Sequence, residues 1–201
     1  MIVGLAGQIA SGKSIVAEEW RRLGALVVSG DGIGKQVVDH DLKLRQRLAR
    51  EFGSQILTPS GKLRRKQLGQ IVFGDRSKIE RLNALVHPPL LRELRRWIRS
   101  FRRKPTAPHL VVDAALIFDW GLERELDAVV VVESKIADQL QRLAKLGLSE
   151  SEARRRIRHQ LPKSYQRRLA NHVIRNSGSL AELRKKARKL FKKLPKSVDN
   201  Q

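Results

Sequence analysis

One short segment near the N-terminus restricts the possible folds more than any other part of the chain. Residues 7–14 read Gly-Gln-Ile-Ala-Ser-Gly-Lys-Ser and satisfy the pattern G-x-x-x-x-G-K-[ST]. The apolar run Ile2–Ala6 precedes this segment, and Ser14–Leu23 follows it with apolar residues at helical spacing. Because this pattern binds phosphate between a strand and a helix, we predict a phosphate-binding loop here. A simple glycine-rich turn is the alternative.

The residues of this loop have distinct expected roles toward ATP and Mg²⁺. Gly7 and Gly12 permit backbone angles that bring successive N–H groups toward one anion. The helix that begins near Lys13 adds its positive N-terminal end to this anion site. Lys13 is expected to neutralise the β- and γ-phosphates, and the Ser14 hydroxyl is expected to bind Mg²⁺.

Further apolar runs predict the remaining strands and the fold class. Ala25–Val28, His109–Phe118 and Asp127–Val132 are short runs, and the last two are apolar on both faces, as central strands are. Strands that alternate with helices favour a parallel sheet with right-handed crossovers. We therefore predict an α/β protein with a P-loop NTPase fold, in which helices cover both faces of a parallel sheet.

The 201 residues are expected to form a single P-loop domain with insertions. The core is predicted at about residues 1–35 and 108–201, with an Arg-rich helical cap inserted at about 36–107. A small lid is predicted at about residues 134–162, where Ser149-Glu150-Ser151-Glu152 is a possible capping box. Apolar stripes at 90–101 and 180–194 have basic opposite faces, which we interpret as solvated helix surfaces.

The composition limits the possible partners and the compartment. With 42 Lys and Arg against 20 Asp and Glu, the formal net charge is +22. Such a field attracts nucleotides, coenzyme A and nucleic acid alike, although a generally arginine-rich or salt-adapted surface is an equal explanation. The absence of cysteine excludes thiolate chemistry and fits a cytoplasmic location. No apolar run approaches the roughly 20 residues that cross a bilayer, so no membrane partner is expected.

Two carboxylates and two lid cations are candidates for catalysis. Asp31 follows the second strand, where ligands of open α/β sheets bind, and is placed to accept a hydroxyl proton; a helix N-cap is an equal alternative. Asp113 ends the buried run 110–112 and is either a Mg²⁺ ligand or part of a turn. Arg142 and Lys145 either close over the γ-phosphate or belong to a solvated surface.

Ordered segments from Ile2 to about Leu190 resemble the dephospho-coenzyme A kinase family. Each segment is weak alone, but their order and spacing together are specific. Besides the phosphate-binding loop, the matching segments are residues 27–31, 61–65, 72–73, 82–88, 113–119, 121–122, 139–142 and 170–178.

The resemblance implies transfer of the ATP γ-phosphoryl group to the ribose 3′-hydroxyl of dephospho-coenzyme A, the last step of coenzyme A biosynthesis. It implies Asp31 as the general base, and it implies that Mg²⁺ is required. The site residues implied are catalytic Asp31, Lys13, Arg142 and Lys145; nucleotide-binding Gly7, Ala10, Ser11, Gly12, Lys13, Ser14, Ile15 and Asn176; substrate-binding Arg65, His87, Leu116 and Asp119; and metal-binding Ser14 and Asp113.

Several positions depart from the family pattern and leave alternatives open. Ala6 lacks a threonine hydroxyl, Ser29 replaces an aspartate, Ala115 replaces a proline, and Lys145 replaces an arginine that would hold phosphate in a bidentate manner. Such changes are compatible with a divergent kinase, with a more negative acceptor, or with a degraded enzyme. The further acidic residues of the family that are replaced here are at Arg64, Asn171 and Arg175.

An alternative from another class is a basic P-loop protein that binds or phosphorylates nucleic acid or another nucleoside-type acceptor. The net charge of +22 permits this reading. Aromatic residues are only 4% of the chain, so stacking platforms for single strands are scarce.

Overall fold

The computed structural model describes residues 1–72 and 74–195, and its contacts divide the chain into two compact units. Met1–Ser29 and the segment from Ser100 onward form the first, which we call the sheet unit; Gly30–Arg99 form the second, the inserted unit. The insertion was predicted at about residues 36–107, and the structure has it at Gly30–Arg99. Phe73, part of one segment of the family resemblance, lies outside the described residues.

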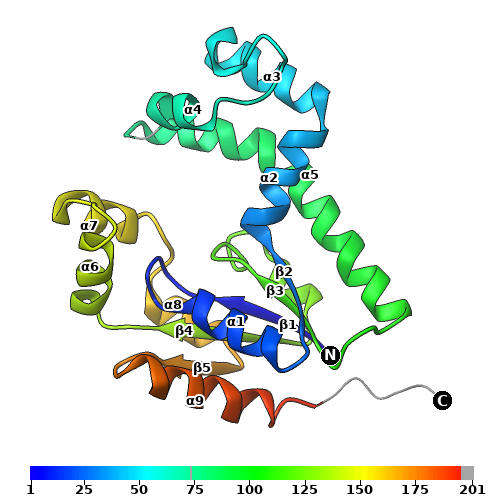
Figure 1. The fold of residues 1–201 in the computed structure, drawn as a ribbon, viewed down its shortest axis with the longest axis vertical. Coiled ribbons are helices and arrows are strands. Elements are labelled where there is room, and N and C mark those ends of the chain that lie inside the picture. The colour runs from blue at the N-terminus through cyan, green and yellow to red at the C-terminus, as the bar shows by residue number, and fades with distance from the viewer. Residues whose placement is uncertain (73, 196–201) are drawn as a thin grey trace. The chain divides into compact units, whose positions relative to one another are not determined.

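The sheet unit contains five parallel strands in the order β2-β3-β1-β4-β5. The strands are β1 (Ile2–Ala6), β2 (Leu26–Ser29), β3 (Leu110–Asp113), β4 (Ala128–Glu133) and β5 (His172–Arg175). All residues of β1 and β4 are buried, because helices and the segment at residues 114–127 cover the apolar side chains of these central strands. The predicted α/β fold with a parallel sheet is confirmed (Figure 1).

Two strands differ from the sequence prediction. The run at residues 109–118 was predicted as one strand, but only Leu110–Asp113 pair in the sheet. The apolar residues that follow, Ile117 among them, are buried in turns and not in a strand. Strand β5 was not predicted, because His172 and Arg175 of this edge strand are exposed and polar.

One face of the sheet is covered by α1 (Lys13–Arg22) and α9 (Leu180–Phe191). Trp20 of α1 is fully buried, and its Nε1 donates to the carbonyl oxygen of Ala187 at 2.9 Å. Ser179 and Glu182 form a capping box that begins α9. The main core cluster of this face includes Val3, Leu5, Val16, Trp20, Val111, Val130, Val132, Ile174, Leu183, Ala187 and Phe191.

The other face is covered by α8 (Lys163–Leu169) and by residues 114–127, which include η2 (Leu122–Glu125). A Cβ atom at Gly4 would lie 2.6 Å from Leu126 Cδ1 and 3.0 Å from Ile117 Cδ1. Glycine therefore lets this segment pack directly on β1.

The predicted lid contains two helices, α6 (Ile136–Ala144) and α7 (Glu150–Arg158), which pack together (Figure 1). Leu143 and Ile157 are buried in a small cluster that also takes in Ile9 and Ala10 of the phosphate-binding loop. Of the predicted capping box, one bond is shown: the Ser149 side chain accepts from the N–H of Glu152, while the Glu152 carboxylate pairs with Arg156. The lid helices are thus in direct contact with the loop.

The inserted unit is helical, as predicted, with its own apolar core. Its elements are α2 (Gly30–His40), α3 (Leu42–Phe52), η1 (Ser54–Ile56), α4 (Arg65–Val72) and most of α5 (Arg76–Arg103). Its core cluster contains Val38, Leu44, Leu48, Phe52, Ile56, Leu68 and Val72. No helix among the described residues has both the length and the apolar composition that crossing a membrane requires.

Candidate active site

The phosphate-binding loop connects β1 to α1 and has three residues with positive φ. Gly7 has φ +149°, and a Cβ atom there would lie 2.4 Å from the carbonyl oxygen of Val132. Gly12 has φ +100°, and a Cβ atom there would lie 2.5 Å from Asn176 Nδ2. Either Cβ atom would collide with its neighbour. Ala10, with φ +58°, has a left-handed conformation that costs a non-glycine residue about 1 kcal/mol. The surrounding contacts must therefore hold this loop in shape.

Side chains from elsewhere in the sheet unit hold three consecutive carbonyl groups of the loop. Gln139 Nε2 donates to the Ile9 carbonyl oxygen at 2.7 Å, and Arg142 Nη1 donates to that of Ala10 at 2.8 Å. Asn176 Nδ2 donates to the carbonyl oxygen of Ser11 at 2.8 Å. With these carbonyls engaged, the N–H groups that follow, at the start of α1, are available for an anion.

Lys13 and Asp113 form an ion pair beside the loop. Lys13 is the first residue of α1, and its Nζ donates to Asp113 Oδ1. Asp113 ends β3, in register with Leu5 of β1 and Ser29 of β2. The two side chains are only 17% and 13% exposed, so the pair is weakly screened by solvent. The structure thus brings together the predicted phosphate lysine and the predicted metal ligand.

Of the two predicted lid cations, Arg142 contacts the loop. Its Nη1 also donates to Ser134 Oγ at 3.0 Å, which fixes the guanidinium group between the loop and the end of β4. Lys145 is exposed to solvent directly after the end of α6. A role for Lys145 at the γ-phosphate stays a prediction.

Asn176 is buried behind the loop. Besides its bond to Ser11, its own N–H donates to the carbonyl oxygen of Glu133 at 2.8 Å. The backbone carbonyl oxygen of Asn176 accepts from Ser134 Oγ at 2.9 Å. These bonds tie the loop to β4 and β5, while contact of Asn176 with a nucleotide stays a prediction.

Sequence reasoning assigned no role to two glutamines that contact the loop, Gln139 and Gln160, or to Gln8 within the loop. Gln160 Oε1 accepts from the N–H of Ile9 at 2.7 Å, and Gln8 Nε2 donates to the carbonyl oxygen of Leu161 at 3.1 Å. Gln139 is completely buried. Its place in the matched segment 139–142 was the one signal in the sequence, since glutamine in a helix otherwise suggests a solvated surface.

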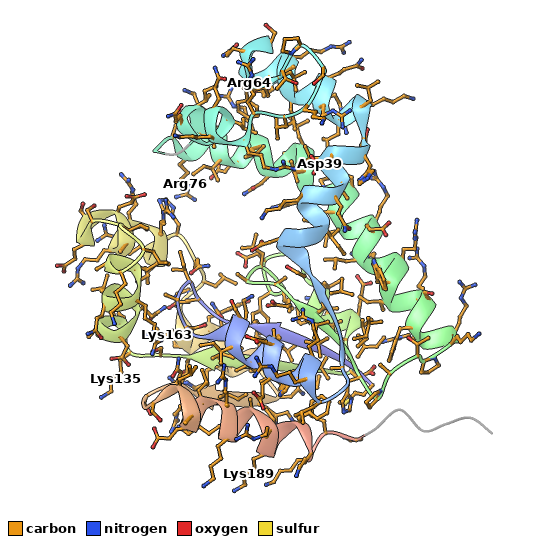
Figure 2. The ribbon with its side chains drawn as sticks, viewed as in Figure 1. Asp39, Arg64, Arg76, Lys135, Lys163 and Lys189 are labelled. Carbon is orange, nitrogen blue, oxygen red and sulfur yellow. The ribbon has the colours of Figure 1, made fainter. Side chains whose placement is uncertain are left out.

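Lys163 is a further basic residue that sequence reasoning missed (Figure 2). It lies at the start of α8, and its Nζ donates to the carbonyl oxygen of Ser134. Burial lowers the pKa of Lys163, while the nearby carboxylates of Glu133 and Asp138 oppose this effect. Glu133 also pairs with Arg167 at 2.9 Å.

The inserted unit contains Asp31, Arg65 and His87, each predicted to act on the acceptor. Asp31 is exposed in the first turn of α2, which begins at Gly30, so the alternative of an N-cap is wrong. Arg65 pairs with Asp39 at 2.6 Å and donates to the carbonyl oxygen of Lys35 at 3.3 Å. His87 is half-buried in α5, and this burial lowers its pKa.

Leu116 and Asp119, the other predicted acceptor residues, lie in the segment that follows β3. Leu116 is half-buried, and Asp119 is exposed as a residue. Desolvation nonetheless raises the pKa of the Asp119 carboxyl group, and a bond from its own backbone N–H partly opposes the rise. Substrate binding by these two residues stays a prediction.

Comparisons with known proteins give one consistent result. A family model described as dephospho-CoA kinase matches residues 1–182. A dephospho-CoA kinase of Corynebacterium diphtheriae is 36% identical over 199 residues, which cover 98% of this chain and 99% of that protein. One of Syntrophotalea carbinolica is 39% identical over 185 residues, covering 92% and 87%. The crystal structure of TT1252 from Thermus thermophilus superposes with a TM-score of 0.75 at 30% identity, covering 96% of this chain and 97% of that one.

Proposed function

The chain belongs to the dephospho-CoA kinase family, and from this premise we propose that it transfers the γ-phosphoryl group of ATP to the ribose 3′-hydroxyl of dephospho-coenzyme A. The product is coenzyme A, so the reaction is the last step of its biosynthesis. The observation that carries the proposal is the geometry of the loop at residues 7–14. Side chains from elsewhere in the sheet unit donate hydrogen bonds to three of its carbonyl groups, and Lys13 pairs with Asp113 at the end of β3. A cytoplasmic location stays a prediction.

ATP is bound through its phosphates in this proposal. Within the segment Ala10–Ile15, the N–H groups of Ala10, Gly12, Lys13 and Ser14 donate to phosphate oxygens, and the N-terminal end of α1 adds a favourable field. The N–H groups of Ser11 and Ile15 already donate to the carbonyl oxygens of Gln8 and Gly12. Gly12, the N-cap of α1, has no side chain that would cap these donors. Lys13 neutralises the β- and γ-phosphates, and Asp113 holds its ammonium group at the loop.

The residues present fit a Mg²⁺ ion that is held chiefly by phosphate oxygens. Ser14 offers an exposed hydroxyl at the start of α1, and Asp113 offers a carboxylate at the end of β3. The described residues contain no group of three or more His, Cys, Asp or Glu side chains arranged to hold a metal. Mg²⁺ typically takes one or two protein oxygens and completes its shell with water and substrate phosphates. When bound, the ion would supply charge neutralisation at the phosphates.

Asp31 is the proposed general base. Its carboxylate takes the proton of the acceptor 3′-hydroxyl as the oxygen forms a bond to the γ-phosphorus, and the bond from that phosphorus to the ADP oxygen breaks. Support comes from its exposed side chain and from its place two residues after Ser29, the end of β2. Carboxyl ends of parallel strands border the ligand site in open α/β sheets.

The departure at Ser29 leaves one strand-end carboxylate in place. Ser29 of β2 stands in register with Asp113 of β3. The carboxyl ends of these two strands therefore still have one aspartate, although Ser29 is not one. We propose that this chain is therefore an active kinase and not a degraded one. Nothing in the structure explains the departure at Ala115.

The test is the initial rate of ADP release by the purified chain with ATP, Mg²⁺ and a panel of acceptors. We expect release to depend on dephospho-coenzyme A and to be weak with nucleosides or RNA. Lys13→Ala should lower kcat on the order of 10²- to 10³-fold, as loss of a group that stabilises transition-state charge does. Lys135→Ala, which removes an exposed lysine before α6, is the matched control and should leave the rate unchanged. Turnover with dephospho-coenzyme A no faster than that of Lys13→Ala would end the proposal.

A further inference from the structure

Two glutamines of the predicted lid bind both backbone groups of a single loop residue, Ile9. Gln160 Oε1 accepts from the Ile9 N–H at 2.7 Å, and Gln139 Nε2 donates to the Ile9 carbonyl oxygen at 2.7 Å. Gln139 lies on α6 and Gln160 lies between α7 and α8, so the bonds come from two different elements. The lid side chains therefore hold both peptide groups of Ile9.

The orientation of each glutamine amide follows from the chemistry of its partner. A backbone N–H can only donate and a carbonyl oxygen can only accept. Gln160 must therefore present its oxygen to Ile9, while Gln139 must present its nitrogen. The two residues cannot exchange roles, and neither contributes a charge.

The Gln139 amide is unpartnered at its other end. Within the described part of the chain, Gln139 Oε1 is buried without a hydrogen-bond partner, which costs free energy that an apolar side chain would not cost. The bond to Ile9 is thus what the amide contributes at this position.

The residue after Ile9 is the one with the strained backbone. Ala10 has φ +58°, a conformation that a non-glycine residue keeps only where its surroundings impose it. Arg142 holds the carbonyl oxygen on its far side, and the glutamines hold the peptide groups on its near side. The N–H groups proposed to bind phosphate begin at this same residue.

We propose that Gln139 and Gln160 are positioning residues for nucleotide binding: they fix Ile9 so that Ala10 keeps its left-handed conformation and the following N–H groups stay directed at the phosphates. This inference rests on the proposed function of the loop. Neither glutamine touches the reacting atoms, so their loss weakens nucleotide binding and leaves the acceptor site intact.

The first test measures the Kd of Mg²⁺–ATP by isothermal titration calorimetry for the full-length chain. Gln139→Leu and Gln160→Leu should each weaken binding roughly five- to tenfold, which is what loss of one such hydrogen bond gives. The KM for ATP should rise by a similar factor, while the KM for dephospho-coenzyme A stays within about twofold. Gln141→Leu, on the exposed surface of the same helix, is the matched control and should bind ATP as the wild type does.

The second test uses the different roles of the two amides. Gln160→Glu keeps an oxygen acceptor for the Ile9 N–H and should retain wild-type affinity within about twofold. Gln139→Glu replaces the donor with a carboxylate that faces a carbonyl oxygen, and should bind ATP no better than Gln139→Leu does. Thermal unfolding of each variant shows whether it is folded at the assay temperature.

A third variant keeps the inference testable if the leucine variants are also less stable. Ala10→Gly, added to Gln160→Leu, removes the strain at this position and should recover part of the lost affinity. Equal ATP affinity in the wild type and both leucine variants would overturn this inference alone. Loss of affinity in Gln160→Glu as large as in Gln160→Leu would also overturn it. A wild-type chain that binds no ATP would overturn the proposed function as well.

Discussion

At the residue scale, the chemistry of the site depends on a few groups that are held by neighbours distant in sequence. Asp113 holds Lys13 across 100 positions of the chain, and Asn176 holds Ser11 across 165. In the proposed function, this carboxylate and this amide hold the lysine and the loop in place before a phosphate binds. Asp31 differs, because it is exposed to solvent in the first turn of its helix.

Replacing Asp31 with asparagine tests its role as the base. Asp31→Asn removes the proton acceptor while keeping the size of the side chain, so kcat should fall on the order of 10²- to 10⁴-fold. The Kd of ATP should not change, because the loop and Lys13 are intact. Stopped-flow or steady-state ADP release with dephospho-coenzyme A measures kcat, and calorimetry measures the Kd of ATP.

The control for this change is Glu80→Gln, which alters an exposed carboxylate of the same compact unit. Glu80 makes a surface ion pair with Arg76 at 2.8 Å, so the control should keep wild-type turnover. A kcat for Asp31→Asn within threefold of the wild type would remove Asp31 from the mechanism.

Stability should depend on pH through His87. Burial lowers the pKa of His87 below its ordinary 6.5, so below pH 6.5 the unfolded chain binds more protons than the folded chain. The unfolding free energy should therefore rise with pH between the lowered pKa of folded His87 and pH 6.5. Above pH 6.5, His87 should cause no further change in the unfolding free energy. Urea unfolding of the wild type and of His87→Asn between about pH 5 and 7.5 measures the difference. Identical pH dependence of the two proteins would show that His87 does not titrate differently on unfolding.

At the element scale, the sheet and its covering helices place the site, and some elements were more predictable than others. Strand β1 was predicted with its observed bounds, because an apolar run ending at the loop glycine is unambiguous. The strand at residues 109–118 was predicted too long, because burial in turns produces the same apolar composition as burial in a strand. Edge strand β5 was missed for the opposite reason, since solvent permits His172 and Arg175 there.

The same division applies to the candidate site. The phosphate-binding loop was predictable because its chemistry is encoded in eight consecutive residues. The sequence did not predict that Gln139 and Gln160 contact Ile9, because they lie 130 and 151 positions away in the chain. Only the fold brings such uncharged side chains to the loop.

Helix α9 supplies a direct test of how the sheet is covered. Leu183 is 2% exposed in the main core cluster, so Leu183→Ala should lower the unfolding free energy by about 2–5 kcal/mol. Leu180, on the same helix, is 48% exposed, and Leu180→Ala should change it by less than about 0.5 kcal/mol. Chemical unfolding of both variants measures the values. Equal destabilisation by the two changes would contradict the packing of α9 on the sheet.

At the scale of the whole molecule, both units contribute to the net charge of +22. The labelled side chains Arg64, Arg76, Lys135 and Lys189 come from separate parts of the chain (Figure 2). Such a distribution favours nonspecific attraction of anions over recognition of one polymer. Nucleotides and coenzyme A precursors are also anions, so the same field favours their approach.

Salt should separate this nonspecific attraction from specific recognition of nucleic acid. We expect fluorescence anisotropy with a labelled RNA to show affinity that falls steeply with salt and is weak at about 0.2 M, because the binding comes from released counterions. Strong RNA binding retained at that salt concentration would instead favour the alternative of a nucleic-acid-binding P-loop protein.

The most direct measurement of the central claim is the identity of the product formed from ATP, Mg²⁺ and dephospho-coenzyme A. Mass spectrometry and ³¹P NMR of the purified product should show one added phosphoryl group, on the ribose 3′-hydroxyl, with one ADP formed for each product molecule. Lys13→Ala should form almost none of it. A product phosphorylated at another position, or ADP formed without any phosphorylated acceptor, would contradict the assignment of this chain as a dephospho-coenzyme A kinase.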